Sequence, residues 1–267
     1  MPNQLYEKDT YTTEEAYMTG NIVEWDIAKA NISILLWKGL ITPEKYEYLY
    51  NCPKAKREIY VGLMQKKDIN VNKGLNEGFK EARKLFFEQN QLDLDRVISI
   101  RKDAVFLHNC IPRTTQFGPI RFVNKGHFTT FVSLPDNVDL FYLYDQYSKD
   151  ELIEVKGISD NMLDRHEEYM VDLLKAILVS AQSEGVKVAL KFIEEVANIY
   201  ASREMDIGYY REFNNRSLFR TVHVIGGERY YIENIPNNTE FNMKYLDISY
   251  NYSILMKLYS IFASKCF

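Results

Sequence analysis

Two aspartates, Asp26 and Asp103, are the residues of this sequence whose type and position best suit a chemical reaction. Asp26 ends the short strand-like segment 22–26, and Asp103 follows Arg101 and Lys102 in the middle of a β-rich segment. Carboxylates held on a rigid sheet can bind two divalent metal ions, which clamp the attacking and leaving oxygens in phosphoryl transfer. Magnesium prefers such hard oxygen ligands. The pair therefore predicts a magnesium site, if the fold places both carboxylates on neighbouring strands.

The segments between the two aspartates have mainly helical patterns. Residues 22–26 predict a strand, and helical spacing over residues 27–39 predicts a helix that ends at Gly39. Thr42 and Pro43 have the residue types of an N-cap and first helical position, so a second helix begins there and stops before Pro53. A third helix is expected over residues 54–66.

A longer helix and a hairpin lead to Asp103. Over residues 74–90 the apolar side chains Leu75, Phe79, Ala82 and Phe86 recur on one face, which predicts an amphipathic helix. Charged residues, Arg83 included, stand between them in the sequence. Residues 96–107 predict two strands joined by a turn at Arg101 and Lys102.

The second half of the chain is first β-rich and then helical. Short β-rich runs are expected at residues 120–123, 127–134, 140–144 and 152–155, amphipathic helices at 160–183 and 186–202, a hairpin between 218 and 232, and a last helix from about Tyr250. We therefore predict an α+β fold with a mixed sheet. Three regions are expected: a palm-like α/β region at 1–157, a helical thumb-like region at 158–205 and a small α+β tail at 206–267.

Composition indicates an ordinary globular protein. The formal net charge is −4, which is unfavourable for a dedicated nucleic-acid-binding module because such modules are generally basic. The three cysteines are far apart and form no CxxC pair, so neither a disulfide framework nor a zinc site is expected. The N-terminal residues are polar and the apolar stretch 32–37 is too short to span a bilayer, which predicts a cytoplasmic protein without membrane contact.

The segments around both aspartates resemble the palm of family B DNA polymerases. Residues 24–35 (EWDIAKANISIL) are similar to motif A, where a strand-end aspartate precedes a helix, and residues 97–107 (VISIRKDAVFL) are similar to motif C. Residues 147–158, which end in Glu-Val-Lys-Gly-Ile, resemble the segment that follows the palm strands and closes on the primer–template duplex. Order and approximate spacing agree from residue 22 to about residue 205.

The resemblance implies a role for individual residues. Asp26 and Asp103 would bind Mg²⁺ and act in catalysis, Lys56 or Arg57 would contact the triphosphate, and Asn31 stands where the family has a tyrosine that excludes ribonucleotides. Lys156 would contact nucleic acid. The sequence departs from motif C at Arg101, which replaces the first aspartate, and Lys102 follows it; two cations beside Asp103 disfavour metal binding.

Simpler interpretations exist for each of these features. Asp26 is also a suitable helix N-cap, and the segment 101–103 a suitable solvated turn. The segment 209–216 carries Arg211 and Arg216 among aromatic residues, which suits nucleic-acid binding, but it also suits a buried aromatic strand. The lysines and arginine between residues 54 and 67 suit a solvated helix face as well as a triphosphate contact.

The sequence thus predicts a compact polymerase-palm-like protein of a phage or another mobile element. It would act on primer–template or other nucleic acid, alone or with viral replication or transcription proteins. Either it transfers nucleotides with Mg²⁺, or it binds without catalysis. If it is catalytic, Arg101 and Lys102 point away from the aspartates; if not, one of them pairs with Asp26 or Asp103. The alternative, favoured by the acidic net charge, is an unrelated α+β protein-interaction module.

Overall fold

The computed structural model describes residues 4–144, 151–158, 163, 167–210, 213, 222–225, 228–231 and 248–266. These residues form two compact units. Unit 1 contains residues up to 14 together with 19–129, and unit 2 contains residues 15–18 together with those from 130 onward.

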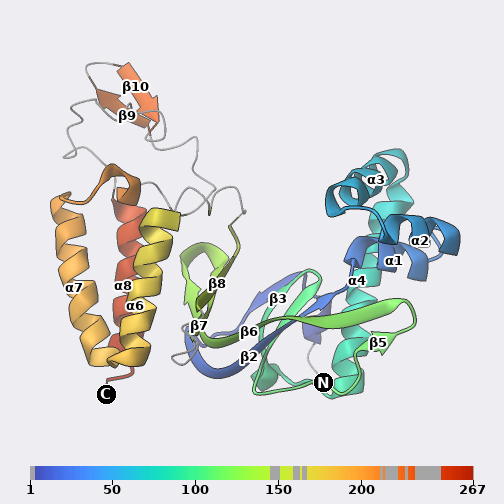
Figure 1. Cartoon of the computed structure of the whole chain (residues 1–267), viewed down its shortest axis with the longest axis horizontal. Coiled ribbons are helices and arrows are strands. Elements are labelled where there is room, and N and C mark those ends of the chain that lie inside the picture. The colour runs from blue at the N-terminus through green and yellow to red at the C-terminus, as the bar shows by residue number, and fades with distance from the viewer. Residues whose placement is uncertain are drawn as a thin grey trace. The chain divides into compact units, whose positions relative to one another are not determined.

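Unit 1 combines antiparallel strands with four helices (Figure 1). After a 3-10 turn at Gln4–Glu7, its elements are β1 (Thr10–Thr12), β2 (Tyr17–Ile27), α1 (Ala30–Trp37), α2 (Pro43–Tyr50), α3 (Lys54–Lys67), α4 (Ile69–Asn90), β3 (Val97–Arg101), β4 (Ala104–His108), β5 (Gln116–Phe117) and the first part of β6 (Ile120–Leu134). Thr42 caps α2, since its hydroxyl accepts a hydrogen bond from the Lys45 N–H at 3.3 Å.

The core of unit 1 lies between α4 and the strands. Phe79, Ala82 and Phe86 of α4 are buried together with Ile100 and Val105 of the β3–β4 hairpin. Two glycines on one face of α4 allow α1 and the segment after it to approach closely, because a Cβ at Gly78 would lie 2.3 Å from Ile34 and one at Gly74 would lie 2.5 Å from Leu40. The helix thus packs against the β3–β4 hairpin, whose turn contains Asp103.

The strand order of the large sheet is β1-β3-β4-β2-β6-β7-β8, with β5 paired to β6. The strand pairs are antiparallel, including β1–β3, β3–β4, β2–β4, β6–β7 and β7–β8. Hydrogen bonds from Ala28 N–H to the Arg121 oxygen and from Ser133 N–H to the Ala16 oxygen give the β2–β6 pair the same sense. The α+β class is therefore confirmed, whereas the predicted mixed sheet is antiparallel.

Unit 2 packs its strands against helices (Figure 1). It contains the end of β6, a 3-10 turn at Pro135–Asn137, β7 (Val138–Tyr144), β8 (Glu151–Lys156), a π-helical turn at Glu167–Val171, α6 (Asp172–Ser183), α7 (Val186–Ser202), a 3-10 turn at Ile207–Tyr210, the hairpin β9 (Val222–Ile225) and β10 (Glu228–Tyr231), and α8 (Ser249–Ala263). Leu140 and Tyr142 of β7 share one core with Leu174 of α6, Ile193 of α7 and Leu258 of α8. Packing thus groups β7 with α6, α7 and α8 in one core.

Most predicted elements occur close to their expected positions, with four differences. The strand predicted at 22–26 is longer and begins at Tyr17, and the helix predicted at 74–90 begins at Ile69. The two runs 120–123 and 127–134 are the single strand β6, and the hairpin turn lies at Lys102 and Asp103. Parts of the expected helix at 160–183 and of the expected hairpin at 218–232 lie outside the described residues. Within the described part of the chain, none of the helices combines the length and the apolar character that crossing a bilayer requires.

Candidate functional site

Asp26 and Asp103 lie on neighbouring strands in unit 1. Strand β2 pairs with β4 so that Asp26 is opposite Ala104, and Asp103 lies in the two-residue turn before β4. The Ile27 N–H donates a hydrogen bond to the Asp103 carbonyl oxygen at 3.2 Å. Asp26 is not the N-cap of the following helix, because Lys29 holds that position. The structure thus brings both carboxylates to one end of the β3–β4 hairpin.

The two carboxyl groups interact directly. Burial raises the pKa of Asp103, the negative charge of Asp26 raises it further, and a hydrogen bond between the two side chains acts in the same direction. The backbone and the positive charge of Lys102 oppose this shift only in part. The Asp26 side chain is itself buried, with 7% of the residue exposed, and its Oδ1 has no hydrogen-bond partner among the described residues. The pair therefore favours a bound proton or another cation.

Lys125 of β6 supplies such a cation. Its Nζ forms an ion pair with Asp26 Oδ2. Burial lowers the pKa of Lys125, but the hydrogen bond to Asp26 and the charges of Asp26, Glu24 and Asp103 outweigh burial, so the net direction is upward. The adjacent Gly126 has no room for a side chain, because a Cβ would lie 2.8 Å from the Phe128 ring. The sequence did not identify Lys125 as a site residue, because no local pattern predicts that its strand, β6, pairs with β2.

The aspartate pair opens into a pocket of about 300 Å³. Four of the predicted site residues line it: Asp26, Asp103, Asn31 and Arg57. Its charged side chains are four cations and three carboxylates, namely Lys29, Lys54, Arg57 and Lys125 with Asp26, Glu58 and Asp103. The cations surround a space of the size that a small ligand needs, so the pocket suits a ligand with negatively charged oxygens.

The cationic side chains of the pocket also make contacts within unit 1. Arg57 Nη1 donates a hydrogen bond to the Cys52 oxygen at 2.6 Å, and Lys54 forms an exposed pair with Glu58 at 3.8 Å. Lys29 donates a hydrogen bond to the Tyr50 oxygen and lies over the Tyr50 ring. Because Lys29 and Arg57 are tied to backbone oxygens, their positions relative to the pocket are defined before any ligand binds.

Other predicted residues lie away from this pocket. Lys56 is exposed, its Nζ lies 5.0 Å from the centre of the Tyr48 ring, and a hydrogen bond to the Tyr48 side chain raises its pKa. Lys156 belongs to unit 2, where it pairs with Glu154 at 2.5 Å. Arg211 and Arg216 lie outside the described residues.

The two cations expected beside Asp103 have other contacts. Arg101 Nη2 donates a hydrogen bond to Thr12 Oγ1 at 3.2 Å, and Lys102 Nζ lies 4.9 Å from the centre of the Phe79 ring. These contacts match the arrangement expected of a catalytic site. A third cation, Lys125, forms the pair with Asp26 that was expected of Arg101 or Lys102 in a non-catalytic site. Asp103 itself is half-buried, so the solvated-turn interpretation describes Lys102 but not Asp103.

Arg83 of α4 contacts the backbone of the Lys102–Asp103 turn. Although it is one of the charged residues between the apolar positions of α4, it is fully buried. Its guanidinium donates hydrogen bonds to the Lys102 oxygen, to the Tyr6 oxygen at 2.8 Å and to Asp9 Oδ1 at 2.8 Å. The position of Arg83, four residues after Phe79 and three before Phe86, already puts it on the apolar stripe. This arginine fixes the backbone that presents Asp103.

The polymerase resemblance implies a magnesium ion at the aspartate pair. Within the described ranges, no group of three histidine, cysteine, aspartate or glutamate side chains is arranged to hold a metal. Magnesium, however, is often bound by one or two carboxylates together with waters and substrate phosphates. The buried, unpartnered Oδ1 of Asp26 beside Asp103 fits that role. The residues therefore fit a magnesium ion that arrives with a phosphate group.

Comparison with known proteins identifies a family for this chain. The family model described as the bacteriophage PBS1 gene 130 protein matches residues 1–264. A search of curated proteins found no match. The matched family agrees with the phage source expected from the sequence, and its description names no activity.

Proposed function

The chain belongs to the bacteriophage PBS1 gene 130 protein family, and we propose that this phage protein is a polymerase-palm-like protein that binds nucleic acid or a nucleotide through the Asp26–Asp103 pocket without transferring nucleotides. The observation that carries this proposal is the ion pair between Lys125 and Asp26 beside Asp103. An ammonium group there compensates the charge of the buried Asp26 carboxylate without a metal ion.

Three features support the palm-like part of the proposal. One aspartate ends a strand, the other lies in the turn of the adjacent hairpin, and α4 packs beneath that hairpin. The chain order of these elements is the one that the resemblance to motifs A and C implies. The helices α2 and α3 lie in the sequence between the two motifs, and α3 contributes Lys54 and Arg57 to the pocket.

The ligand is assigned from the charges of the pocket. Lys54 and Arg57 are suited to phosphate oxygens, Arg57 through a planar guanidinium that can bind two of them. Asn31 offers an amide that can donate to a base or sugar oxygen. This set suits a nucleoside polyphosphate or the end of a nucleic-acid strand better than an uncharged ligand.

Nucleotidyl transfer is the second candidate, favoured by the unpartnered Oδ1 of Asp26 next to Asp103. A bound magnesium ion would stabilise the negative charge that develops on the transferred phosphoryl group. In that case Asp26 and Asp103 would hold the ion, and Lys125 would leave Asp26 for a phosphate oxygen.

Primer extension and binding measured together separate the two candidates. Wild type, Asp103→Asn and Arg57→Gln are compared for extension of a labelled primer with Mg²⁺ and for binding to the same duplex. We expect no extension by any of them, unchanged binding for Asp103→Asn, and binding weakened roughly tenfold for Arg57→Gln, the loss of one charge-assisted contact. Extension by wild type that Asp103→Asn abolishes would establish catalysis. Absence of both extension and binding would support the unrelated interaction module.

A further inference from the structure

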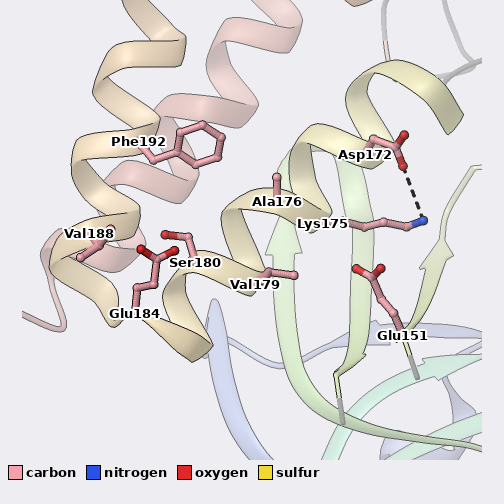
Figure 2. Close-up of a pocket in the computed structure, with 9 residues that line it drawn as sticks. All are labelled: Glu151, Asp172, Lys175, Ala176, Val179, Ser180, Glu184, Val188 and Phe192. Atoms are coloured by element: carbon pink, nitrogen blue, oxygen red, sulfur yellow. Dashed lines mark ion pairs between the residues drawn. The ribbon is translucent and has the colours of Figure 1, made fainter. Parts of the chain in front are cut away.

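An open groove of about 610 Å³ runs along α6 in unit 2 (Figure 2). Its apolar part consists of Ala176 and Val179 of α6 with Val188 and Phe192 of α7. None of the predicted site residues lines it. The groove is therefore separate from the aspartate pocket, and its occupant does not depend on the ligand proposed for that pocket.

The groove is acidic. Glu151, Asp172 and Glu184 bring three carboxylates, and Lys175 is the one cation among its lining residues. Lys175 pairs with Asp172 at 3.6 Å, and Tyr142 donates a hydrogen bond to Glu151 Oε1 at 3.0 Å. These contacts neutralise one of the three charges, so an occupant with basic groups beside apolar side chains is favoured.

Ser180 adds a second and independent feature. Only 8% of this residue is exposed, and its hydroxyl makes no hydrogen bond within the described part of the chain. Its neighbour Ser183, by contrast, donates to the Val179 oxygen at 2.7 Å, as helical serines often do. Figure 2 shows the Ser180 oxygen on the groove side of α6, near Glu184. The hydroxyl therefore reaches the groove, where it can form a hydrogen bond with an occupant.

The outward face of α3 in unit 1 has the complementary composition. Ile59 and Leu63, four residues apart, are 65% and 51% exposed. At 100° per residue they lie opposite the Arg57 and Val61 face that lines the aspartate pocket. Three exposed lysines flank them, namely Lys56, Lys66 and Lys67. This face is apolar along its centre and basic along both sides.

We propose that α3 of a second copy of this chain docks in the groove along α6. An amphipathic helix binds a groove through apolar residues at i and i+4, which Ile59 and Leu63 supply. Their counterparts are Val179, Val188 and Ala176, while the lysines meet Glu151 and Glu184. Each copy carries both the helix and the groove, so the contact is head-to-tail and either closes reciprocally into a dimer or extends further.

The test is a complementation experiment followed by molecular mass. Leu63→Asp removes the helix face but keeps the groove, and Ala176→Trp blocks the groove but keeps the helix; both positions are exposed, so both variants fold. Sedimentation or light scattering follows the mass over about a hundredfold range of protein concentration. We expect wild type to self-associate more weakly at high salt, each variant alone to be monomeric, and the mixture to form a 1:1 complex.

Ile111→Asp is the matched control, because Ile111 is a highly exposed apolar residue of unit 1 outside α3. It is expected to associate as wild type does. Circular dichroism and thermal unfolding confirm that each variant is folded. A wild type that stays monomeric throughout, a mixture that does not associate, or variants that associate as well as wild type would each overturn the proposal.

Discussion

The pocket of unit 1 and the groove of unit 2 each contain three carboxylates, but these carboxylates differ in burial and in ion pairing. In the pocket, Asp26 is buried, and Lys125 compensates it directly. In the groove, the Asp172 side chain is 56% exposed and pairs with Lys175 at a longer distance of 3.6 Å. Burying a charge costs several kcal/mol, whereas water screens an exposed one. The comparison indicates that the charge of a buried carboxylate requires a cation from the same chain. The carboxylates of an exposed groove are screened by water and can stay without such a cation until a partner binds.

Removing the buried arginine below the pocket is expected to have the largest effect. Arg83→Ala leaves the Lys102 and Tyr6 oxygens without their donor and creates a cavity at the base of the turn. The expected loss is about 3–5 kcal/mol in the free energy of unfolding, measured by urea titration. Lys84→Ala on the same helix removes an exposed contact to Glu88 at 3.9 Å and a contact of Nζ with the Tyr6 ring at 5.9 Å, and is expected to cost less than about 1 kcal/mol. Equal losses would show that α4 does not hold the turn through Arg83.

Replacing Lys125 tests the compensation itself. Lys125→Ala leaves Asp26 and Asp103 without their ammonium group, and since about half of the Lys125 side chain is exposed, the expected loss is about 1–2 kcal/mol. If Lys125 stands where a cation would bind, Mg²⁺ raises the melting temperature of the variant more than that of wild type. Both are followed by thermal unfolding at neutral pH.

Lys54→Ala is the control for Lys125, because Lys54 lines the same pocket with a largely exposed side chain. Its stability and its response to Mg²⁺ are expected to equal those of wild type. A Lys125→Ala variant as stable as wild type, and insensitive to Mg²⁺, would mean that the acid pair is balanced in another way.

The elements around the pocket were largely predictable, because local patterns determine them. The period of Leu75, Phe79, Ala82 and Phe86 gave α4, and the β-rich residues on both sides of Arg101 gave the hairpin. The proximity of Asp26 and Asp103 followed from the resemblance to two motifs rather than from periodicity. Their functional role stays a prediction.

Lys125 was not predictable in the same way, because its position depends on a strand pairing between distant segments. The Asn-Lys-Gly sequence at 124–126 suggests a turn, yet the backbone stays extended within β6. The hydrogen bonds from Ala28 to Arg121 and from Ser133 to Ala16 define the pairing of β6 with β2 that brings Lys125 to Asp26. Register between strands separated by about a hundred residues is decided by packing of both faces, which no local pattern contains.

The shifted pKa of Asp103 makes a prediction about pH. Because its pKa is raised in the folded state, the unfolded chain loses this proton first as pH rises, so the carboxyl group lowers stability above its ordinary pKa. Asp103→Asn removes that cost and keeps a donor for Asp26. We expect its melting temperature to exceed that of wild type by about 2–4 °C near pH 7, the shift that 1 kcal/mol gives at this size. The groups facing Asp103 are Asp26, Lys102, Lys125 and Arg83.

The advantage of Asp103→Asn is expected to vanish below about pH 4, where the wild-type carboxyl group is protonated in both states. Asp172→Asn, in the exposed groove, serves as the control and is expected to change the melting temperature by less than about 1 °C at either pH. An advantage that persists at low pH would assign the effect to packing rather than to charge.

The smallest effect on stability is expected for substitution of Ser180, in the groove of unit 2. Ser180→Ala removes a hydroxyl that has no hydrogen-bond partner among the described residues and introduces the better helix former, so the isolated chain is expected to be unchanged or stabilised by up to about 0.5 kcal/mol. Ser183→Ala, which loses a bond to the Val179 oxygen, is the matched comparison. If the Ser180 hydroxyl serves a docked helix, its removal weakens self-association roughly fivefold, the worth of one ordinary hydrogen bond, while Ser183→Ala leaves association unchanged. A Ser180→Ala chain that is clearly destabilised would show that the hydroxyl supports unit 2 itself, and the groove would then lose its most specific contact with a partner.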